Sequence, residues 1–217
     1  MTSDFRARLR QRAGAGLTLE PPILSRLEAY HRLLTHWNRR INLTSLQLDP
    51  ISEQALDRLF VEPLVAAKYI PDVSLDWFDL GSGGGSPAFP IRIVRPSARL
   101  TLIEARSRKA AFLREVAREL ELAGVEVVNE RLEAITSREA LGASADLVTV
   151  RAVKADQALG KTVRHILRDD GRLLLFSTPG AANTLRIAGL IQSTSSRLAA
   201  AGHAELLIFQ RDVPRSS

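Results

Sequence analysis

The sequence predicts an α/β protein, with a mostly parallel sheet covered by helices on both faces and a helical region in front of it. Three observations lead to this fold class. Apolar residues recur at helical spacing before Pro71, short apolar runs alternate with helical segments after it, and a glycine-rich turn follows the first of those runs. We therefore expect a helical extension over residues 1–71 and an α/β domain over residues 72–217.

The extension is predicted to contain two long helices, and we expect the first seventy residues to be wholly helical. Pro21 and Pro22 can open the first helix because proline is tolerated in a first turn. The apolar stripe of this helix consists of Leu24, Leu27, Tyr30, Leu34, Trp37 and Ile41. The second helix is predicted over residues 52–68, with inward positions at Ala55, Leu59 and Leu64.

In the α/β domain, short apolar runs predict strands at residues 75–80, 99–103, 125–128, 146–150, 172–176 and 204–209. Helices are predicted between them, at residues 88–94, 106–122, 155–167 and 182–190. The amphipathic pattern is clearest in residues 106–122, where Leu113, Val116, Ala117 and Leu120 share one stripe. Residues 193–210 leave room for only a compact final hairpin.

Composition and charge narrow the classes of function. The chain has no cysteine, which excludes disulfides, thiolate metal sites and a cysteine nucleophile and fits a cytoplasmic protein. The net charge is +6, and only four of the 30 basic residues are lysines, so the excess is arginine, a planar donor suited to phosphate. No apolar run approaches the roughly 18–20 residues of a membrane span, and the N-terminal residues lack the apolar core of a signal peptide. We expect a nucleic-acid partner and no membrane partner.

Residues 77–87 read W-F-D-L-G-S-G-G-G-S-P, and the glycines directly follow the first predicted strand. Ligands of such sheets bind beyond the carboxyl ends of the strands, which argues against a plain linker. A dinucleotide fingerprint, G-x-G-x-x-G/A, fails at Ser86. The pattern D-x-G-x-G-x-G is met in full by Asp79, Gly81, Gly83 and Gly85. It resembles the first motif of the Rossmann-like S-adenosylmethionine methyltransferases, whose cationic cofactor suits an acidic residue before the glycines.

Glu104 ends the second predicted strand and is the second candidate for a cofactor contact. A carboxylate at this point can accept hydrogen bonds from both hydroxyls of a ribose. Enzymes that use NAD have the same device, so Glu104 indicates a nucleoside ligand without choosing between the cofactors. Residues 129–133, at the end of the third strand, lie where a methyltransferase would bind the adenine edge.

Five segments together resemble a known family, the bacterial small-subunit rRNA guanine-N7 methyltransferases, also called glucose-inhibited division protein B. The similarity extends from about Leu24 to about Leu175. The segments are W-N-R-R-I-N-L-T at residues 37–44, D-L-G-S-G-G-G-S-P at 79–87, S-R-K-A-A-F-L-R-E-V at 107–116, R-L-E at 131–133 and R-A at 151–152. The resemblance implies a Rossmann-like methyltransferase fold that binds S-adenosyl-L-methionine and methylates 16S rRNA, either as naked RNA or in the small ribosomal subunit.

Motif and resemblance together give a set of expected site residues. The expected cofactor contacts are Asp79, Gly81, Gly83, Gly85, Ser86, Glu104, Leu132, Glu133 and Arg151. The expected RNA contacts are Arg39, Arg40, Arg106, Arg108 and Lys109, and the N-terminal arginines Arg6, Arg8, Arg10 and Arg12 are further candidates. Guanine N7 has a free lone pair and needs no general base, so we name no catalytic proton-transfer residue, and we expect no metal. A monomer is favoured, although the sequence leaves the oligomeric state open.

The chain also departs from the family pattern. Where the family usually has R-H-x-x-D-S, this chain has D-R-L-F-V-E at residues 57–62, which places Arg58, Val61 and Glu62 at changed positions, and Ser177 replaces a lysine after the fifth strand. Trp37 and Asn42 are interpreted as structural, with Asn42 and Thr44 bonding at a helix end. An NAD-dependent oxidoreductase and a non-catalytic RNA- or ribosome-binding module remain the alternatives.

Overall fold

The computed structural model describes residues 2–14, 18–153, 156–178, 180–181, 185–198 and 204–212. The chain begins with α1 (Thr2–Ala13) and α2 (Pro21–Asn38). The second predicted helix is present as a continuous series of α3 (Glu53–Leu56), the π turn η1 (Asp57–Val61), α4 (Glu62–Ala66) and the 3₁₀ turn η2 (Ala67–Tyr69). The expectation of a wholly helical extension is wrong for residues 39–52, which contain no helix.

The side chain of Asn38 explains why the helix ends there. Its Oδ1 accepts hydrogen bonds from the backbone N–H groups of Leu43 and Thr44, at 2.9 and 3.0 Å, and its Nδ2 donates to Thr44 O at 3.1 Å. These bonds replace helical ones and turn the chain back. The capping role predicted for Asn42 therefore belongs to Asn38, because Asn42 is exposed, while the Thr44 Oγ1 accepts from Leu46 N at 3.1 Å as a local turn would require.

The described residues form one sheet with the strand order β3-β2-β1-β4-β5-β7-β6. Its strands are β1 (Asp76–Leu80), β2 (Arg99–Ile103), β3 (Val125–Val128), β4 (Ala145–Arg151), β5 (Leu167–Ser177), β6 (Leu190–Arg197) and β7 (Glu205–Arg211). The first five strands run parallel, and β7 and β6 add an antiparallel hairpin at one edge. The predicted mostly parallel sheet and final hairpin are confirmed. Because the strand order reverses between β1 and β4, a crevice is expected at their carboxyl ends.

The helices of the α/β part are α5 (Ala88–Val94), α6 (Ser107–Glu119), α7 (Leu132–Ile135), the 3₁₀ turn η3 (Glu139–Leu141) and α8 (Gln157–Ile166). The helix predicted over residues 182–190 is wrong where it can be compared. Residues 182–184 lie outside the described residues, 185–189 are not helical, and Leu190 begins β6. Gly189 has φ +75°, and the strand that follows it pairs with β7, so tertiary pairing decides the structure of this segment.

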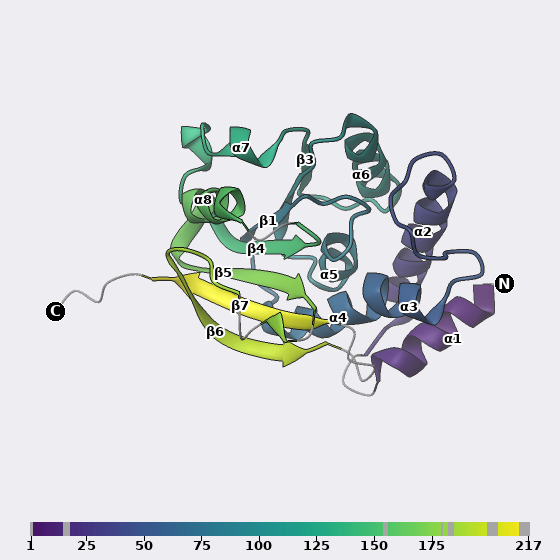
Figure 1. Ribbon diagram of the computed structural model, residues 1–217. Helices are drawn as coiled ribbons and strands as arrows, with labels where there is room; N and C mark the ends of the chain where they lie inside the picture. The colour runs from purple at the N-terminus through teal and green to yellow at the C-terminus, as the bar shows by residue number, and fades with distance from the viewer. Residues whose placement is uncertain are drawn as a thin grey trace.

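Helices cover both faces of the sheet (Figure 1), and the buried apolar residues form two clusters. On one face, α7 and α8 pack on residues such as Phe78 and Val148. On the other, α5 and α6 pack together with the N-terminal helices around the fully buried Trp77. The helical extension therefore shares one core with the sheet. Among the described helices, none is long and apolar enough to cross a membrane.

Candidate functional site

The glycine loop leaves β1 and turns sharply before α5. Gly81 N and Ser82 N both donate to Ile103 O, at 2.9 and 3.1 Å. Gly81, Gly83 and Gly85 have φ values of 71°, 53° and 82°. A Cβ at Gly81 would lie 2.6 Å from Val153 Cγ2, and one at Gly85 would lie 2.3 Å from the Phe89 ring. Glycine is therefore required at these two positions by both conformation and space.

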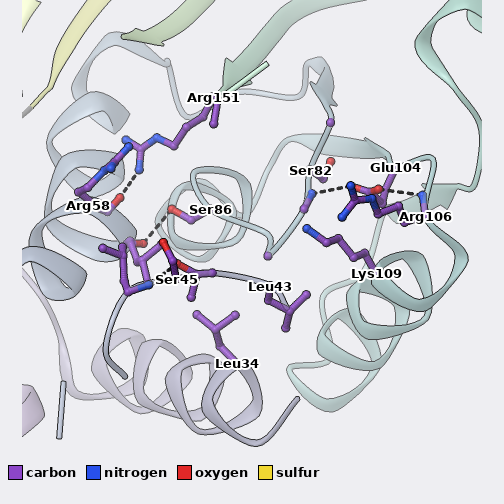
Figure 2. Close-up of a pocket in the computed structure, with 17 residues that line it drawn as sticks. Leu34, Leu43, Ser45, Arg58, Ser82, Ser86, Glu104, Arg106, Lys109 and Arg151 are labelled. Carbon is purple, nitrogen blue, oxygen red and sulfur yellow. Dashed lines mark hydrogen bonds between the residues drawn. The ribbon is translucent and has the colours of Figure 1, made fainter. Parts of the chain in front are cut away.

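A cavity of about 400 Å³ lies against this loop, and we call it the glycine-loop cavity. Figure 2 shows Arg58 and Arg151 on one side of it, Glu104, Arg106 and Lys109 on the opposite side, and Ser86 between them. Leu34 and residues 43–46 of the helical extension form a further wall. The cavity is large enough for a small ligand and lies at the strand-order reversal between β1 and β4.

Glu104, with Gly81 and Arg106, lies where this cavity meets a second one. Its Oε2 accepts from Gly83 N at 2.9 Å and its Oε1 accepts from Arg106 N at 2.8 Å, so its carboxylate is fixed from both sides. The second cavity, of about 390 Å³, is bordered by the ends of β2 and β3, and we call it the β2–β3 cavity. It is lined by Gly81, Ile103, Glu104, Ala105, Arg106, Glu130, Arg131, Leu132 and Glu133. The Leu132–Glu133 position is therefore brought beside Glu104, as expected.

Asp79 lies near the end of β1, just before the glycine loop, and is not among the residues that line either cavity. It is 1% exposed, and its Oδ1 accepts from the Thr149 hydroxyl at 2.5 Å. The Thr149 oxygen in turn accepts from the Trp77 indole N–H at 2.9 Å. Burial raises the pKa of Asp79 to about 6, although the hydrogen bond from Thr149 opposes this. The Asp79 side chain thus bonds to strand β4, while its backbone oxygen accepts from the Ser82 hydroxyl of the loop at 2.9 Å, and a direct contact with a cofactor stays a prediction.

The helical extension holds the glycine loop by contacts that the sequence did not predict. The Tyr30 hydroxyl donates to Gly84 O at 2.6 Å, and the Ser86 hydroxyl donates to Leu59 O at 3.0 Å. A Cβ at Gly84 would lie 3.4 Å from Leu34. Trp37, for which we expect a structural role, is half-buried with its ring centroid 5.8 Å from that of Phe112. The extension therefore serves as one wall of the glycine-loop cavity.

The π turn η1 leaves two backbone carbonyl oxygens free to accept from side chains outside the helix. Glu62 N donates to Asp57 O, five residues back, and Pro63 has no N–H to donate to the preceding turn. The carbonyl oxygens of Arg58 and Leu59 instead accept from side chains elsewhere in the fold, Arg151 and Ser86. Pro63 inside a predicted helix is the sequence signal from which this irregularity could have been found.

Arg151 ends β4 at the wall of the glycine-loop cavity. Its Nη1 donates to Arg58 O, and its Nη2 donates to the Glu62 carboxylate at 2.8 Å. Its guanidinium carbon lies 4.3 Å from the centre of the Phe176 ring. Burial lowers the pKa of Arg151 to about 10, against the opposing effect of Glu62, and burial raises the pKa of Glu62. The arginine is held on three sides, and the residue after it, Ala152, has φ +56°.

Comparison with known proteins supplies the family. The model of the GidB family, described as rRNA small subunit methyltransferase G, matches residues 23–187. The chain belongs to this family. Proteins named ribosomal RNA small subunit methyltransferase G are similar over most of the chain: one from Syntrophotalea carbinolica is 36% identical over 76% of this chain and 73% of its own length. One from Chromobacterium violaceum is 34% identical over 79% of this chain and 77% of its own length.

Solved structures agree on the fold. A mutant of MtNAS in complex with S-adenosylmethionine has a TM-score of 0.58 at 12% identity and covers 97% of this chain and 96% of its own. A putative methyltransferase, yhhF from Escherichia coli, has a TM-score of 0.51 at 19% identity, over 65% of this chain and 78% of its own. These likenesses support the Rossmann-like methyltransferase fold expected from the sequence.

Three of the four positions at which this chain departs from the GidB-family pattern meet at a third cavity, of about 310 Å³. We call it the β4–β5 cavity because it lies at the ends of these strands. It is lined by Arg58, Glu62, Arg151, Ala152, Val153, Leu175, Phe176, Ser177, Thr178, Leu185 and Ala204. The fourth position, Val61, is 2% exposed and belongs to the core. Arg58, Arg151 and Ala152 also line the glycine-loop cavity, so the two cavities adjoin.

The predicted RNA contacts of this GidB-family chain fall into two groups. Arg106 and Lys109 line the glycine-loop cavity, and Arg108 is exposed beside them. Arg39 and Arg40 are exposed after α2, where Arg39 pairs with Asp49 at 3.0 Å. Three of the N-terminal arginines pair with carboxylates elsewhere in the chain: Arg6 with Glu28, Arg8 with Glu53 and Arg12 with Asp57, so their contact with RNA stays a prediction. Within the described ranges, no three His, Asp or Glu residues gather as a metal site would require.

Proposed function

We propose that this chain transfers the sulfonium methyl group of S-adenosyl-L-methionine to N7 of a guanine in 16S rRNA of the small ribosomal subunit, in the cytoplasm. The observation that carries the proposal is a ligand cavity at the strand-order reversal in a chain of the rRNA small subunit methyltransferase G family. The names of its relatives support an rRNA substrate. The guanine, its N7 atom and the assembled subunit are the finer parts of the proposal.

The residues present fit the cofactor in two parts. Glu104 stands at the border of both cavities, and each of its oxygens has a lone pair left to accept from a ribose hydroxyl. The β2–β3 cavity beside Leu132 and Glu133 would then take the adenine, and the glycine-loop cavity, with Gly81, Gly83 and Ser86, the amino-acid end. Asp79 and Gly85 would support the loop, and Arg151 would border the methyl group.

The same geometry gives no support to an NAD-dependent oxidoreductase. A dinucleotide places its pyrophosphate on free N–H groups at the start of the helix after the glycine loop. Here that helix follows Pro87 and has Pro90 in its first turn, so both positions lack an N–H. Phe89 N already donates to Gly85 O at 2.7 Å. A ligand without a pyrophosphate is therefore the better match.

Methyl transfer to N7 requires alignment more than proton transfer. The N7 lone pair lies in the plane of the base and is free at neutral pH, so the chain must hold nitrogen, methyl carbon and sulfur in line. When bound, the cofactor supplies an electrophilic methyl group and a neutral sulfur leaving group. The protein's share is to bind both reactants, to exclude water and to expose a base that is flipped or looped out of its helix.

The experiment that tests this function offers S-adenosylmethionine with a tritiated methyl group to 30S subunits and to naked 16S rRNA. We expect label on a guanine, mapped to N7 by mass analysis of the nucleosides. Binding of S-adenosylmethionine and of NAD is compared by calorimetry in parallel. Binding of NAD alone would rule out the methyltransferase, and cofactor binding without transfer to either RNA substrate would favour a non-catalytic ribosome-binding module.

The cofactor contact is tested separately by Glu104→Gln. This change removes the charge and one acceptor while keeping the shape, and we expect S-adenosylmethionine to bind about tenfold or more weakly, the value of one charge-assisted hydrogen bond. Glu126→Gln on the neighbouring strand is the matched control, because Glu126 is exposed and lines neither cavity. Equal affinities of the two variants would remove Glu104 from the site.

The basic rim is proposed as the RNA contact and comprises Arg39, Arg40, Arg106, Arg108 and Lys109. Replacing Arg108 by Gln should weaken binding to 16S rRNA, and the slope of log affinity against log salt should fall by about one if Arg108 neutralises one phosphate. Arg8→Gln serves as the control, because Arg8 is already bonded to Glu53 and to Ile51 O. If Arg8→Gln changes the salt slope as much as Arg108→Gln, the rim is misplaced.

A further inference from the structure

We propose that Glu62 is a positioning residue for methyl transfer: together with the carbonyl of Arg58, it fixes the guanidinium of Arg151 at the boundary between the glycine-loop cavity and the β4–β5 cavity. This inference rests on the proposed function. It assigns a role to a residue at which the sequence comparison shows only a departure from the family pattern.

The position of Glu62 is set by the π turn. In a regular α-helix the backbone N–H of Val61, the fourth residue after Asp57, would donate to Asp57 O. The π turn instead makes Glu62 N the donor to Asp57 O, so Glu62 takes that place. Val61 goes to the core, and the carboxylate of Glu62 faces the end of β4. One inserted residue in the helix thus decides which side chain meets Arg151.

The Glu62 carboxylate is buried, and only one of its two oxygens has a hydrogen-bond partner among the described residues. Glu62 is 0% exposed, its Oε2 binds Arg151 at 2.8 Å, and its Oε1 has no hydrogen-bond partner among the described residues. A buried charge with an unsatisfied oxygen is costly, and a leucine here would cost nothing of this kind. Such a group is expected where it serves the position of its partner and not stability alone. The left-handed conformation of Ala152, directly after Arg151, is a second strained feature at the same place.

The contacts that hold Arg151 leave some of its guanidinium N–H groups free to donate to a ligand. A guanidinium has five N–H donors, and the bonds to Arg58 O and Glu62 engage two of them, which leaves three. The side chain retains 10% exposure and lines both cavities. A methyl acceptor must reach the glycine-loop cavity from a space that adjoins it, and the β4–β5 cavity is such a space. A guanine there presents O6 beside N7, and O6 is an acceptor that arginine binds well.

The charge of Glu62 matters as well as its position. The transfer forms a bond between N7 and the methyl carbon and breaks the bond between that carbon and sulfur, so the positive charge moves from the sulfonium to the purine. An uncompensated arginine beside the purine would oppose the arrival of this charge. Because Glu62 contacts Arg151 in a buried place, its charge offsets that of Arg151, while Arg58 on the same wall keeps its own charge. Arg151 can then orient the base with less repulsion of the product.

The test measures kcat and KM for tritium transfer to 30S subunits by the full chain, as wild type, Glu62→Gln, Arg151→Lys and the double variant. We expect each single change to lower kcat about tenfold to a hundredfold with KM for S-adenosylmethionine changed by less than about threefold, as for a misplaced orienting group. The double variant should be no slower than the slower single variant, because Glu62 acts through Arg151. Losses that multiply in the double variant would overturn the proposal.

The matched control is Asp57→Asn, which removes the charge of a buried, arginine-paired carboxylate on the same helical segment. It should leave kcat at the wild-type value, since Asp57 lines none of the three cavities. If Glu62→Gln does not fold, Glu62→Asp withdraws the carboxylate by one methylene and should still lower kcat. If the Glu62 variant that folds has the kcat of the wild type, the inference is overturned. Absence of transfer by the wild type, in contrast, would refute the proposed function itself.

Discussion

Asp57 and Glu62 stand on either side of the same π-turn backbone bond, and each is a buried carboxylate paired with an arginine from a distant part of the chain. Asp57 pairs with Arg12 of α1, whose Nε lies 2.5 Å from Asp57 Oδ1. Glu62 pairs with Arg151 at the end of β4. The two arginines differ in their access to water. The side chain of Arg12 is 31% exposed and that of Arg151 is 10% exposed.

This difference in exposure distinguishes the Arg12 pair, which attaches a helix, from the Arg151 pair, which lies at the functional site. The Arg12 pair joins an outer helix to the body of the protein, where water can solvate the arginine if its partner is lost. The Arg151 pair lies between two cavities, with Phe176 over the guanidinium and, within the described part of the chain, no hydrogen-bond partner for Glu62 Oε1. The chemistry of the two pairs is the same, and the surroundings decide what each contributes.

The largest expected effect comes from removing Arg151. Arg151→Met leaves the carboxyl group of Glu62 fully buried and without its arginine, and we expect the free energy of unfolding to fall by about 3–5 kcal/mol. Urea unfolding followed by circular dichroism measures this change. The double variant Arg151→Met with Glu62→Leu should recover most of the loss, because it removes the stranded carboxyl group. If the double variant is as unstable as the single one, the cost lies in packing and not in the buried carboxylate.

A smaller effect is expected from the outer pair. Asp57→Asn should lower the free energy of unfolding by about 1.5–3 kcal/mol, the range for a lost hydrogen bond to a charged group, because Arg12 can turn to water and to Glu53. Limited proteolysis should then cut near α1 sooner, and the urea midpoint should fall. A loss as large as that of Arg151→Met would erase the difference between the two pairs.

The sequence predicted most of the fold because its signals there are local. Alternating runs and the glycine turn indicated the parallel strands, and D-x-G-x-G-x-G with Glu104 indicated one side of the site. The other side was not predictable in this way. The wall formed by Leu43 to Leu46 depends on how Asn38 turns the chain, and the Glu62–Arg151 pair joins residues 89 positions apart.

The π turn shows most clearly why a comparison by position fails here. Aligned residue by residue, Val61 and Glu62 look like the loss of an acidic position and the gain of a misplaced one. The extra residue of the π turn rotates the rest of the helix about its axis, so the carboxylate returns to face β4. Pro63 was visible in the sequence, but its consequence, the freeing of the Arg58 and Leu59 carbonyls, depends on partners from other strands and loops.

The smallest expected effect is the change of folding stability with pH. It again distinguishes the contact of α1 from the pair of Glu62 and Arg151. His31 stacks on Phe5 of α1 with ring centroids 4.8 Å apart, and its Nε2 lies 3.0 Å from Leu48 O. Burial lowers the pKa of His31, against the hydrogen bond to Leu48 and the charges of Asp49 and Glu28. The folded state then binds fewer protons than the unfolded state, so stability should be complete above the usual histidine pKa of about 6.5 and decline as the pH falls below it.

Glu62 changes stability with pH in the opposite sense, because burial raises its pKa. At pH values just above the usual pKa of a glutamate, the folded state then binds more protons than the unfolded state. Between pH 7 and pH 5 the wild type should therefore lose stability relative to His31→Gln, whose amide can still reach the Leu48 carbonyl. The same pH-dependent difference should appear when His31→Gln is made in the Glu62→Gln background. If the difference between wild type and His31→Gln does not change with pH, the acid sensitivity does not arise at the α1 contact. Asp79 cannot be its source either, because a pKa raised to about 6 acts in the same sense as that of Glu62 and favours the folded state as the pH falls.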